Sequence, residues 1–465
     1  MKSSIIKKMW EHERLFFDYE LKHASPPSGF YRIILLLDEA VHDVLGAAGK
    51  IVSISAWSNF FHGVLREIKP PSRNGPAYLE TLNIGFFQET VLTLDPSPSD
   101  AKRGYKRYVR GKNGVNSFLT SESLNSALTT KLDWDPRLRI EDSSKNYQYI
   151  LARISSVQET LRHLIGSKIR RAALDPEARP LLNERKIAIA SDIDAQNDEI
   201  SVFQSCYFAS MLTTDLSSKS VTQRFSNRER IVLYADKNYP LYQDGGKIFL
   251  PSLSESAQLI SNQIGINTIL LTKDNYLVFP RQNLTANMHA GDVMPSASGS
   301  MDWDDLATLD TPTFRELCKN SALREIREEL GRNYTKIRQS GELGLSDFFL
   351  TGLYRGLVRG CKPDVAAFGV LNWRRTDLRE QLNEIQTLEN SPVTSENQDE
   401  SGTTFWLEVL NAEDMKDKLR DFVKAAPEGR SISLDATLHC VLRALEKHPE
   451  VFDQAFRKTL KFLRS

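Results

Sequence analysis

The sequence predicts an α+β protein. We expect its C-terminal part to be a mixed sheet sandwiched between helices, preceded by a separate N-terminal α/β domain. Three observations carry this prediction. The 465 residues exceed one ordinary domain, apolar runs of strand length recur in the second half, and a helix-spaced segment lies among them. We expect residues 1–190 to form the α/β domain and residues 191–465 the domain with the mixed sheet.

The N-terminal half alternates short apolar runs with helical spacing. Residues 33–37 and 51–57 have strand character, and a segment with helical spacing that ends at glycine separates them. Residues 147–174 have the leucine spacing of one or two helices. The segment SDIDAQNDE, at 191–199, is rich in acids and places the domain boundary near residue 190.

The C-terminal half has clearer signals. Two apolar runs, 269–271 and 277–279, flank the turn-forming triplet Lys273-Asp274-Asn275, which predicts a β-hairpin. Periodic apolar residues predict a long amphipathic helix over 314–330. Two more strands are expected, within 348–354 and 365–371, before a polar surface loop and a helical C-terminus.

Charge and cysteine content restrict the class of protein. Sixty basic residues balance sixty acidic ones, so the whole molecule offers no strong field for nucleic acid or an anionic membrane. The four cysteines form no CxxC pair, which favours a reducing compartment. No uncharged apolar run reaches the length of a membrane span or a secretory signal, so we expect a cytoplasmic protein without a membrane partner. A homo-oligomer stays open.

A local exception to the neutral charge is KRGYKRYVRGK, at 102–112, with six basic residues and two tyrosines. Aromatic rings between basic side chains are typical of surfaces that bind single-stranded nucleic acid. A basic stretch on a neutral protein is more often ordinary surface. We therefore do not expect nucleic acid as a partner.

The segment that carries chemistry is Arg324-Glu325-Ile326-Arg327-Glu328-Glu329-Leu330-Gly331. On a helix, Glu325, Glu328 and Glu329 stand at i, i+3 and i+4, which places three carboxylates on one face. Like charges repel there unless a cation lies between them, and Mg²⁺ or Mn²⁺ prefers carboxylate oxygens. The alternative is a solvated helix whose arginines neutralise the acids.

This spacing resembles the Nudix box of the Nudix hydrolase superfamily, in which a glutamate precedes an Arg-Glu-apolar-x-Glu-Glu-x-Gly sequence by seven residues. Glu316 and the segment from Arg324 to Gly331 match this pattern. Asp310 replaces the leading glycine of the box, and Arg332 replaces an apolar residue. If the loop before the helix is enlarged, Gly299 can take the place of that glycine. The resemblance covers about residues 204–444 and implies a Nudix-like fold there.

The resemblance also implies roles for particular residues. Arg324 would orient a neighbouring carboxylate, and Glu329 or Glu325 would help to deprotonate the attacking water. Arg281, after the second hairpin strand, would bind substrate. The divalent cation, Mg²⁺ or Mn²⁺, would be bound by Glu325, Glu328 and Glu329, and Glu316 would be structural or an outer ligand of the metal. Glu316 also fits a capping box with Thr313, and Asp364, an additional candidate acid, also fits a turn.

The implied activity is divalent-metal-dependent hydrolysis of a nucleoside diphosphate linked to another moiety, so the expected partner is a small nucleotide-type substrate. The alternative is a non-catalytic nucleotide-metabolite sensor or interaction protein on the same fold, and the large unassigned N-terminal region favours it. Isomerisation of an isoprenoid diphosphate is a remote third reading, because we find no cysteine and acid pair dedicated to that chemistry.

Overall fold

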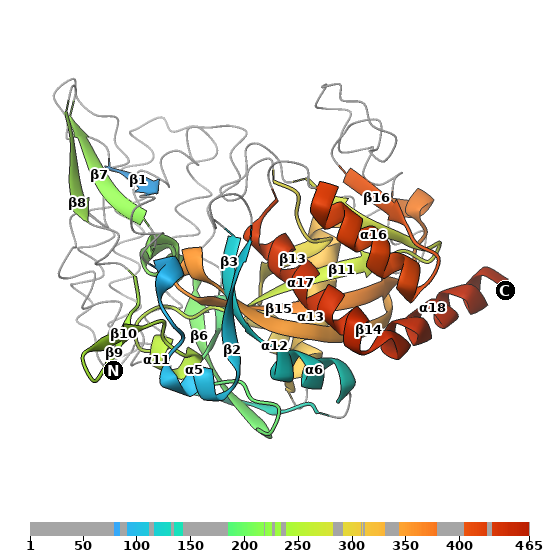
Figure 1. The fold of residues 1–465 in the computed structure, drawn as a ribbon, viewed down its shortest axis with the longest axis horizontal. Helices are drawn as coiled ribbons and strands as arrows, with labels where there is room; N and C mark the ends of the chain where they lie inside the picture. The colour runs from blue at the N-terminus through green and yellow to red at the C-terminus, as the bar shows by residue number, and fades with distance from the viewer. Residues whose placement is uncertain are drawn as a thin grey trace, which may run out of the picture.

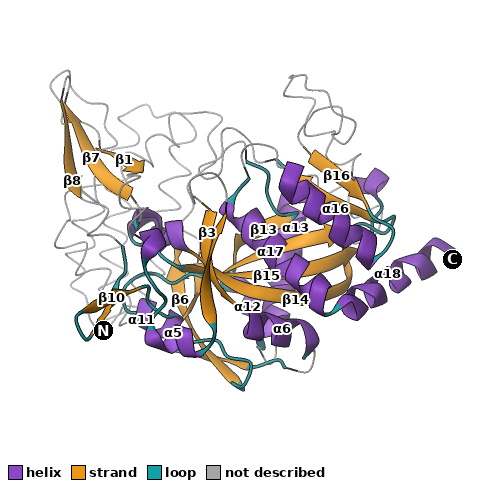
Figure 2. Cartoon of the chain, in the orientation of Figure 1, coloured by secondary structure: helices purple, strands orange, loops and turns teal. Residues whose placement is uncertain are grey.

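The structure is a computed structural model of all 465 residues (Figures 1 and 2). The part described here comprises residues 79–83, 91–110, 116–131, 134–142, 185–217, 219–225, 228–233, 239–281, 292–307, 309, 312–330, 344–378, 404–425 and 430–464. The strands predicted at 33–37 and 51–57 and the helices predicted at 147–174 lie outside these residues. None of the described helices is both long enough and apolar enough to span a bilayer.

The main sheet has eight strands in the order β16, β12, β11, β15, β14, β3, β2, with β13 paired to β11 beside this path. Strands β11 and β15 are parallel, and their neighbours are antiparallel. The sheet is therefore mixed, as predicted. Its strands are β2 (Tyr105–Arg110), β3 (Asn116–Ser121), β11 (Gly265–Leu271), β12 (Tyr276–Pro280), β13 (Ala297–Ser300), β14 (Leu345–Gly356), β15 (Lys362–Leu371) and β16 (Thr404–Glu408).

Helices cover both faces of this sheet (Figure 1). Helix α13 (Phe314–Leu330) packs on one face, where Phe314 and Ala322 share a core cluster with Ile266 of β11 and Val365 of β15. The other face carries α16 (Ala412–Ala425), α17 (Ile432–Lys447) and α18 (Pro449–Arg464), whose apolar side chains pack against Phe368. The prediction of a mixed sheet sandwiched between helices is confirmed.

The predicted hairpin is β11 and β12. Leu271 pairs with Leu277 in antiparallel register, and Asn275 in the turn has a φ of 66°. Asparagine tolerates this left-handed conformation better than most residues. The helix predicted over 314–330 is confirmed as α13, and the strands predicted within 348–354 and 365–371 are confirmed as parts of β14 and β15.

Residues from the N-terminal half complete the sheet, which differs from our expectation of a separate domain. Strand β3 pairs with β14, and Thr120 donates a 2.7 Å hydrogen bond to the carbonyl of Leu353. The predicted boundary near residue 190 also lies between two strands that are hydrogen-bonded to each other, β5 (Arg185–Ile189) and β6 (Glu199–Cys206). Within the described residues, the boundary does not divide the fold.

The remaining elements form smaller units around the main sheet. Strand β6 is the centre of a three-stranded sheet with β4 and β5, and β7 is the centre of another with β1 and β8. Strands β9 and β10 form a hairpin. The bounds are β1 (Leu79–Asn83), α5 (Pro98–Lys102), α6 (Glu122–Thr130), β4 (Arg137–Ile140), α9 (Tyr207–Leu212), η2 (Thr214–Leu216), β7 (Lys219–Phe225), β8 (Arg228–Leu233), β9 (Tyr242–Asp244), β10 (Lys247–Phe249), α11 (Leu253–Ser256), α12 (Asp304–Ala307) and η3 (Leu357–Arg359).

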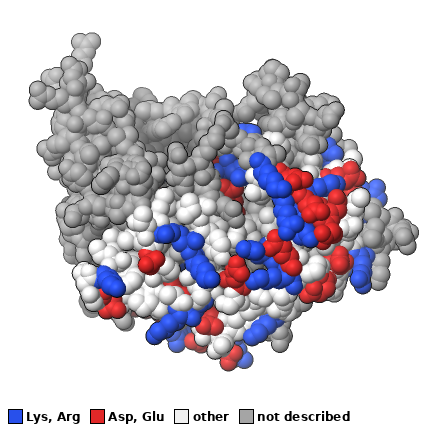
Figure 3. Space-filling view, viewed as in Figure 1, with Lys and Arg blue, Asp and Glu red and all other residues white. Residues whose placement is uncertain are grey.

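The basic stretch at 102–112 is not a plain surface loop, because residues 105–110 of it are strand β2. Tyr105 is buried in the core, and Tyr108 stacks on Phe118. These two rings are therefore held by the protein and are not arranged as a stacking surface. Basic and acidic side chains lie next to each other over α16 and α17 on the face drawn in Figure 3, which agrees with the balanced composition.

Candidate metal centre

The candidate site lies where α13 crosses β13. The carboxylate of Glu325 lies directly against Gly299, so closely that a Cβ atom at Gly299 would overlap both carboxylate oxygens. Only glycine leaves this space. Glu325 is 7% exposed. The next residue, Ile326, is fully buried and packs the helix against the sheet. Gly299 therefore gives the Glu325 carboxylate the space that it occupies, and its equivalence to the glycine of the box stays a prediction.

Arg324 connects the acids on this helix face. Its Nη1 donates to Glu325 at 2.8 Å and lies 3.4 Å from Glu328, one turn further along α13. Its Nη2 donates to the carbonyl of Ser300 at 2.9 Å. The guanidinium is thus fixed between the helix and β13, and it faces the carboxylates in the way predicted. Its role in catalysis stays a prediction.

Two aspartates before the helix fix the other side of Arg324, and the sequence analysis missed both. Nε of Arg324 lies 3.1 Å from Asp305 and 3.2 Å from Asp302. Asp305 also accepts hydrogen bonds from the hydroxyl of Ser321, at 2.6 Å, and from the backbone amide of Asp302, at 3.0 Å. The signal in the sequence is Asp302-Trp303-Asp304-Asp305, three acids close after Gly299.

Lys186 of β5 adds the second cation of the cluster through an ion pair with Asp302. Its position 139 or more residues before the helix acids Glu325 and Glu328 gave no sequence signal. These contacts join two cations, Lys186 and Arg324, to four carboxylates: Asp302, Asp305, Glu325 and Glu328. The described cluster has more acids than bases.

Burial makes the acidic excess costly. Desolvation raises the pKa of the Glu325 carboxyl to about 7, against an opposite effect of Arg324 and with a further rise from Glu328. A buried carboxylate is stabilised by a bound cation or by a proton. The site therefore has the charge that a divalent cation would compensate.

The predicted site residues are not all brought together. Glu328 lies beside Arg324 with a side chain that is 58% exposed, whereas the side chain of Glu329 is outside the described residues. Glu316 is nine positions before Glu325 on a continuous helix, about 13 Å along its axis and on the opposite side. It accepts from the hydroxyl of Thr313 at 3.1 Å. The helix therefore separates the two carboxylates too far for Glu316 to share one cation with Glu325, and a structural or outer-ligand role of Glu316 stays a prediction.

The described contacts of two other candidates do not include Arg324. Arg281 follows β12, where its guanidinium lies over the ring of Phe405, 5.6 Å from the centroid. Substrate binding by Arg281 stays a prediction. Asp364 is a strand residue of β15 and is paired with Lys362 at 2.6 Å.

Register shows which face Asp364 occupies. Gly265 pairs with Asp364, and Ile266 pairs with Val365 in the parallel register of β11 and β15. Ile266 and Val365 belong to the cluster under α13, and successive strand residues alternate between faces. The Asp364 side chain therefore lies on the face opposite Glu325, and the idea that Asp364 is a further acid near the metal is wrong.

The residues present fit a hard divalent cation. Glu325 and Glu328 are one turn apart on one helix face, and Glu328 accepts only long contacts from Arg324, so it retains acceptor capacity. A group of three histidine, cysteine or acidic side chains with metal-binding geometry does not occur among the described residues, from which the side chain of Glu329 is excluded.

Comparison with known proteins adds little to this geometry. No protein-family model matches the sequence, and no curated protein does. Among solved structures, the chain is similar to the crystal structure of DR0079 from Deinococcus radiodurans, at 12% identity and a TM-score of 0.20, over 38% of this chain and 82% of that one. A likeness of this size carries no argument. The assignment of function therefore depends on the residues described above.

Proposed function

We propose that this protein is a divalent-metal-dependent pyrophosphohydrolase of the Nudix type, which cleaves the phosphoanhydride bond of a nucleoside diphosphate linked to another moiety. One observation carries the proposal. The buried Glu325 carboxylate lies against Gly299 and is bound by Arg324, which also faces Glu328. Acids mounted in this way on a packed helix are suited to stabilising charge on a phosphoryl group.

The chain's own residues supply position and charge. Arg324 would hold the Glu325 carboxylate in one orientation through its charge-assisted hydrogen bond, and the packing of Ile326 would keep the helix on the sheet. Glu325 and Glu328, with Glu329, would hold Mg²⁺ or Mn²⁺. The bound cation would supply charge stabilisation at the phosphate oxygens and lower the pKa of water.

The first test measures Mn²⁺ binding by titration calorimetry and then the release of monophosphate from a panel of nucleoside diphosphate derivatives. We expect Glu328→Gln to weaken Mn²⁺ binding and to reduce turnover by orders of magnitude without unfolding the protein. The matched control is Glu413→Gln on α16, because Glu413 is also exposed on a helix and paired with a base three positions away. Equal Mn²⁺ binding by wild type and Glu328→Gln would contradict the metal role.

A sensor that binds a nucleotide metabolite without cleaving it is the second candidate. Its support is that Arg324 already contacts both Glu325 and Glu328, so the two acids are neutralised in part by the protein itself. For a sensor, we expect calorimetry to show tight binding of a nucleoside diphosphate derivative. Chromatography would then show no product after long incubation with Mg²⁺. Product formation that is lost in Glu328→Gln decides for the enzyme.

A further inference from the structure

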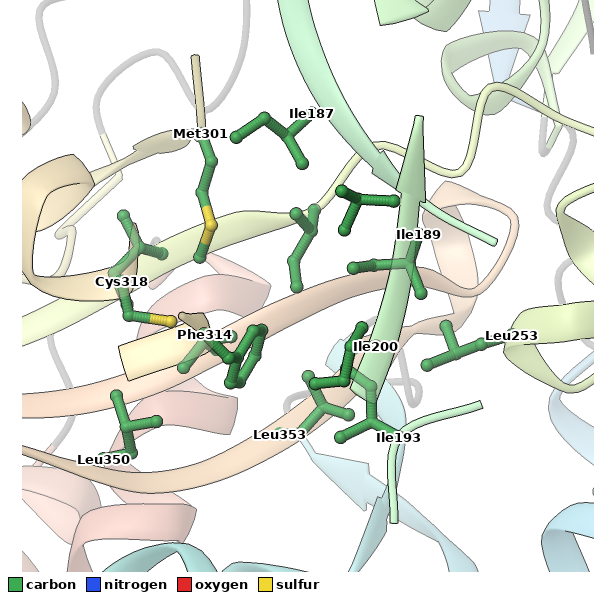
Figure 4. Packing of buried hydrophobic residues seen from close by; sticks show 14 of the residues in the cluster. Ile187, Ile189, Ile193, Ile200, Leu253, Met301, Phe314, Cys318, Leu350 and Leu353 are labelled. Carbon is green, nitrogen blue, oxygen red and sulfur yellow. The ribbon is translucent and has the colours of Figure 1, made fainter. Parts of the chain in front are cut away.

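Strand β5, from the N-terminal half of the chain, is bound along the segment that precedes α13. The amide of Ile187 donates to the carbonyl of Met301 at 2.9 Å, and the amide of Trp303 donates to the carbonyl of Arg185 at 3.0 Å. Ile187 and Met301 also lie together in the core under α13 (Figure 4). The backbone of residues 301–303 is therefore held by β5 as if by a neighbouring strand.

Side chains continue this contact as far as the candidate metal centre. Lys186 pairs with one carboxylate oxygen of Asp302, and the other oxygen lies 3.2 Å from Nε of Arg324. Nη1, on the other side of the same guanidinium, donates to Glu325 at 2.8 Å. A planar guanidinium turns as one body. Fixing Nε therefore fixes the direction in which Nη1 points.

The Lys186–Asp302 ion pair differs in burial from the ion pair next to it. The side chains of Lys186 and Asp302 are 8% and 18% exposed, whereas those of the adjacent pair, Arg185 and Asp304, are 40% and 71% exposed at 2.6 Å. An exposed pair contributes little because water screens it. A buried charge needs its partner in place. Two consecutive residues of β5 thus make ion pairs of different kinds to the same short segment.

We infer that Lys186 is a positioning residue of the candidate site: through Asp302 it holds Arg324 in the orientation that binds the Glu325 carboxylate. This inference rests on the proposed function. It assigns to β5 a part in the metal centre, so that the site is complete only when residues 185–189 are bound to the C-terminal part. The charge of Lys186 also acts on Glu325 directly and lowers its pKa.

Position and charge can be separated by experiment, because they predict opposite changes in Mn²⁺ affinity for Lys186→Met. Lys186→Met removes a positive charge near Glu325, so charge alone would tighten Mn²⁺ binding. Asp302→Asn removes a negative charge, so charge alone would weaken it. If Lys186 acts by position, both variants weaken Mn²⁺ binding, by about 10-fold or more, as is usual for residues that orient metal ligands. Titration calorimetry with Mn²⁺ alone measures this without any substrate.

Three controls belong to this test. Arg185→Met and Asp304→Asn make the same charge changes in the exposed pair and should leave the Mn²⁺ dissociation constant within about 2-fold. Lys186→Arg keeps the charge and should restore part of the affinity that Lys186→Met loses. Melting temperatures measured beside each titration show whether a variant is folded. If Lys186→Met is not folded, Lys186→Arg tests the contact, because charge alone would leave its Mn²⁺ affinity at the wild-type value, whereas a changed position weakens it.

The outcomes are distinct. Wild-type binding of Mn²⁺ together with equal or tighter binding by Lys186→Met overturns the inference and leaves the proposed function standing. A wild type that binds no Mn²⁺ overturns both. Weaker binding in both Lys186→Met and Asp302→Asn, with unchanged controls in the exposed pair, is the result that we expect.

Discussion

Two arginines that each bind several acids, the buried Arg355 and the half-buried Arg324, differ in the balance of charge around them. Arg355, on β14, is fully buried, and its Nη1 lies 2.8 Å from Asp100 of α5. Asp100 is shared with Arg103, which also contacts Asp192 at 3.1 Å. That cluster joins two bases to two acids. The cluster around Arg324 joins two bases to four acids.

The difference teaches how a structural cluster can be told from a candidate site. In a balanced cluster of buried charges, the bases neutralise the acids without help from solution. Here such a cluster attaches α5, which belongs to the N-terminal half of the chain, to the main sheet. A cluster whose described contacts join more acids than bases is stabilised by a proton or a cation from solution. We therefore expect substitutions at Arg355 to change stability, and substitutions around Glu325 to change metal binding and pH dependence.

The largest effect should come from breaking the balanced cluster. Arg355→Met leaves the buried Asp100 without the fully buried one of its two bases, and removal of one partner of a buried pair costs about 3–5 kcal/mol of unfolding free energy. Urea denaturation followed by circular dichroism measures it. Arg139→Met is the control, since Arg139 also pairs with acids but its side chain is 57% exposed. That variant should lose much less stability than Arg355→Met, because water screens an exposed ion pair. Similar losses in both variants would contradict the comparison.

A smaller effect is expected where the sheet meets the unbalanced cluster. Gly299→Ala places a methyl group where the Glu325 carboxylate lies, so either the carboxylate or β13 must move. Overpacking of this kind costs about 1–3 kcal/mol, and the displaced Glu325 should bind Mn²⁺ more weakly. Thermal denaturation and Mn²⁺ titration measure the two effects.

Gly356→Ala is the matched control for this substitution, because the nearest atom to a Cβ there is a flexible Ile432 methyl at 3.5 Å. We expect Gly356→Ala to leave Mn²⁺ binding as it is. If Gly299→Ala also binds Mn²⁺ like wild type, then Glu325 is not a ligand.

The smallest effect concerns pH. Burial raises the pKa of Glu325 in the folded protein to about 7, above its ordinary value of 4.5. The folded state therefore binds the proton more tightly, and stability from this group is lost as pH rises from about 4.5 through 7. The variant Glu325→Gln does not lose stability in this way, because glutamine does not titrate. Without metal, the variant should gain stability relative to wild type between pH 5 and pH 8, on the order of 1 kcal/mol.

Denaturation of wild type and Glu325→Gln at pH 5 and at pH 8, in the presence of a chelator, measures the sign of the stability difference between them. A gain for Glu325→Gln at pH 5 that disappears at pH 8 would contradict the raised pKa. Addition of Mn²⁺ at pH 8 should reverse the order, because the cation stabilises only the carboxylate of the wild type.

The elements that sequence predicted well are those with local signals. The turn at Lys273-Asp274-Asn275 and the apolar period of 314–330 depend on neighbours within a few residues, and the structure has both. Strand β2 was missed because its buried Tyr105 lies among basic residues, which outweigh it in any reading of the local pattern. Its pairing with β3 and β14 depends on distant residues.

The same limit applies to the site. The box gave Arg324, Glu325 and Glu328 as neighbours because helix geometry fixes their relation. It does not place Glu316 beside them, because nine positions on a helix put a side chain on the opposite side. Lys186 and Asp302 could not be linked to Arg324 from sequence, since their contacts arise only when β5 lies along residues 301–303.

The hydrogen bond from Thr120 to Leu353 spans 233 residues, and this has a consequence during synthesis. Strands β2 and β3 leave the ribosome long before β14 is synthesised. The edge of β3 that later pairs with β14 is therefore unpaired during this time. Pairings so distant in sequence slow folding and leave strand edges available for aggregation. Chaperone dependence of nascent chains should therefore end only after residue 356 has emerged.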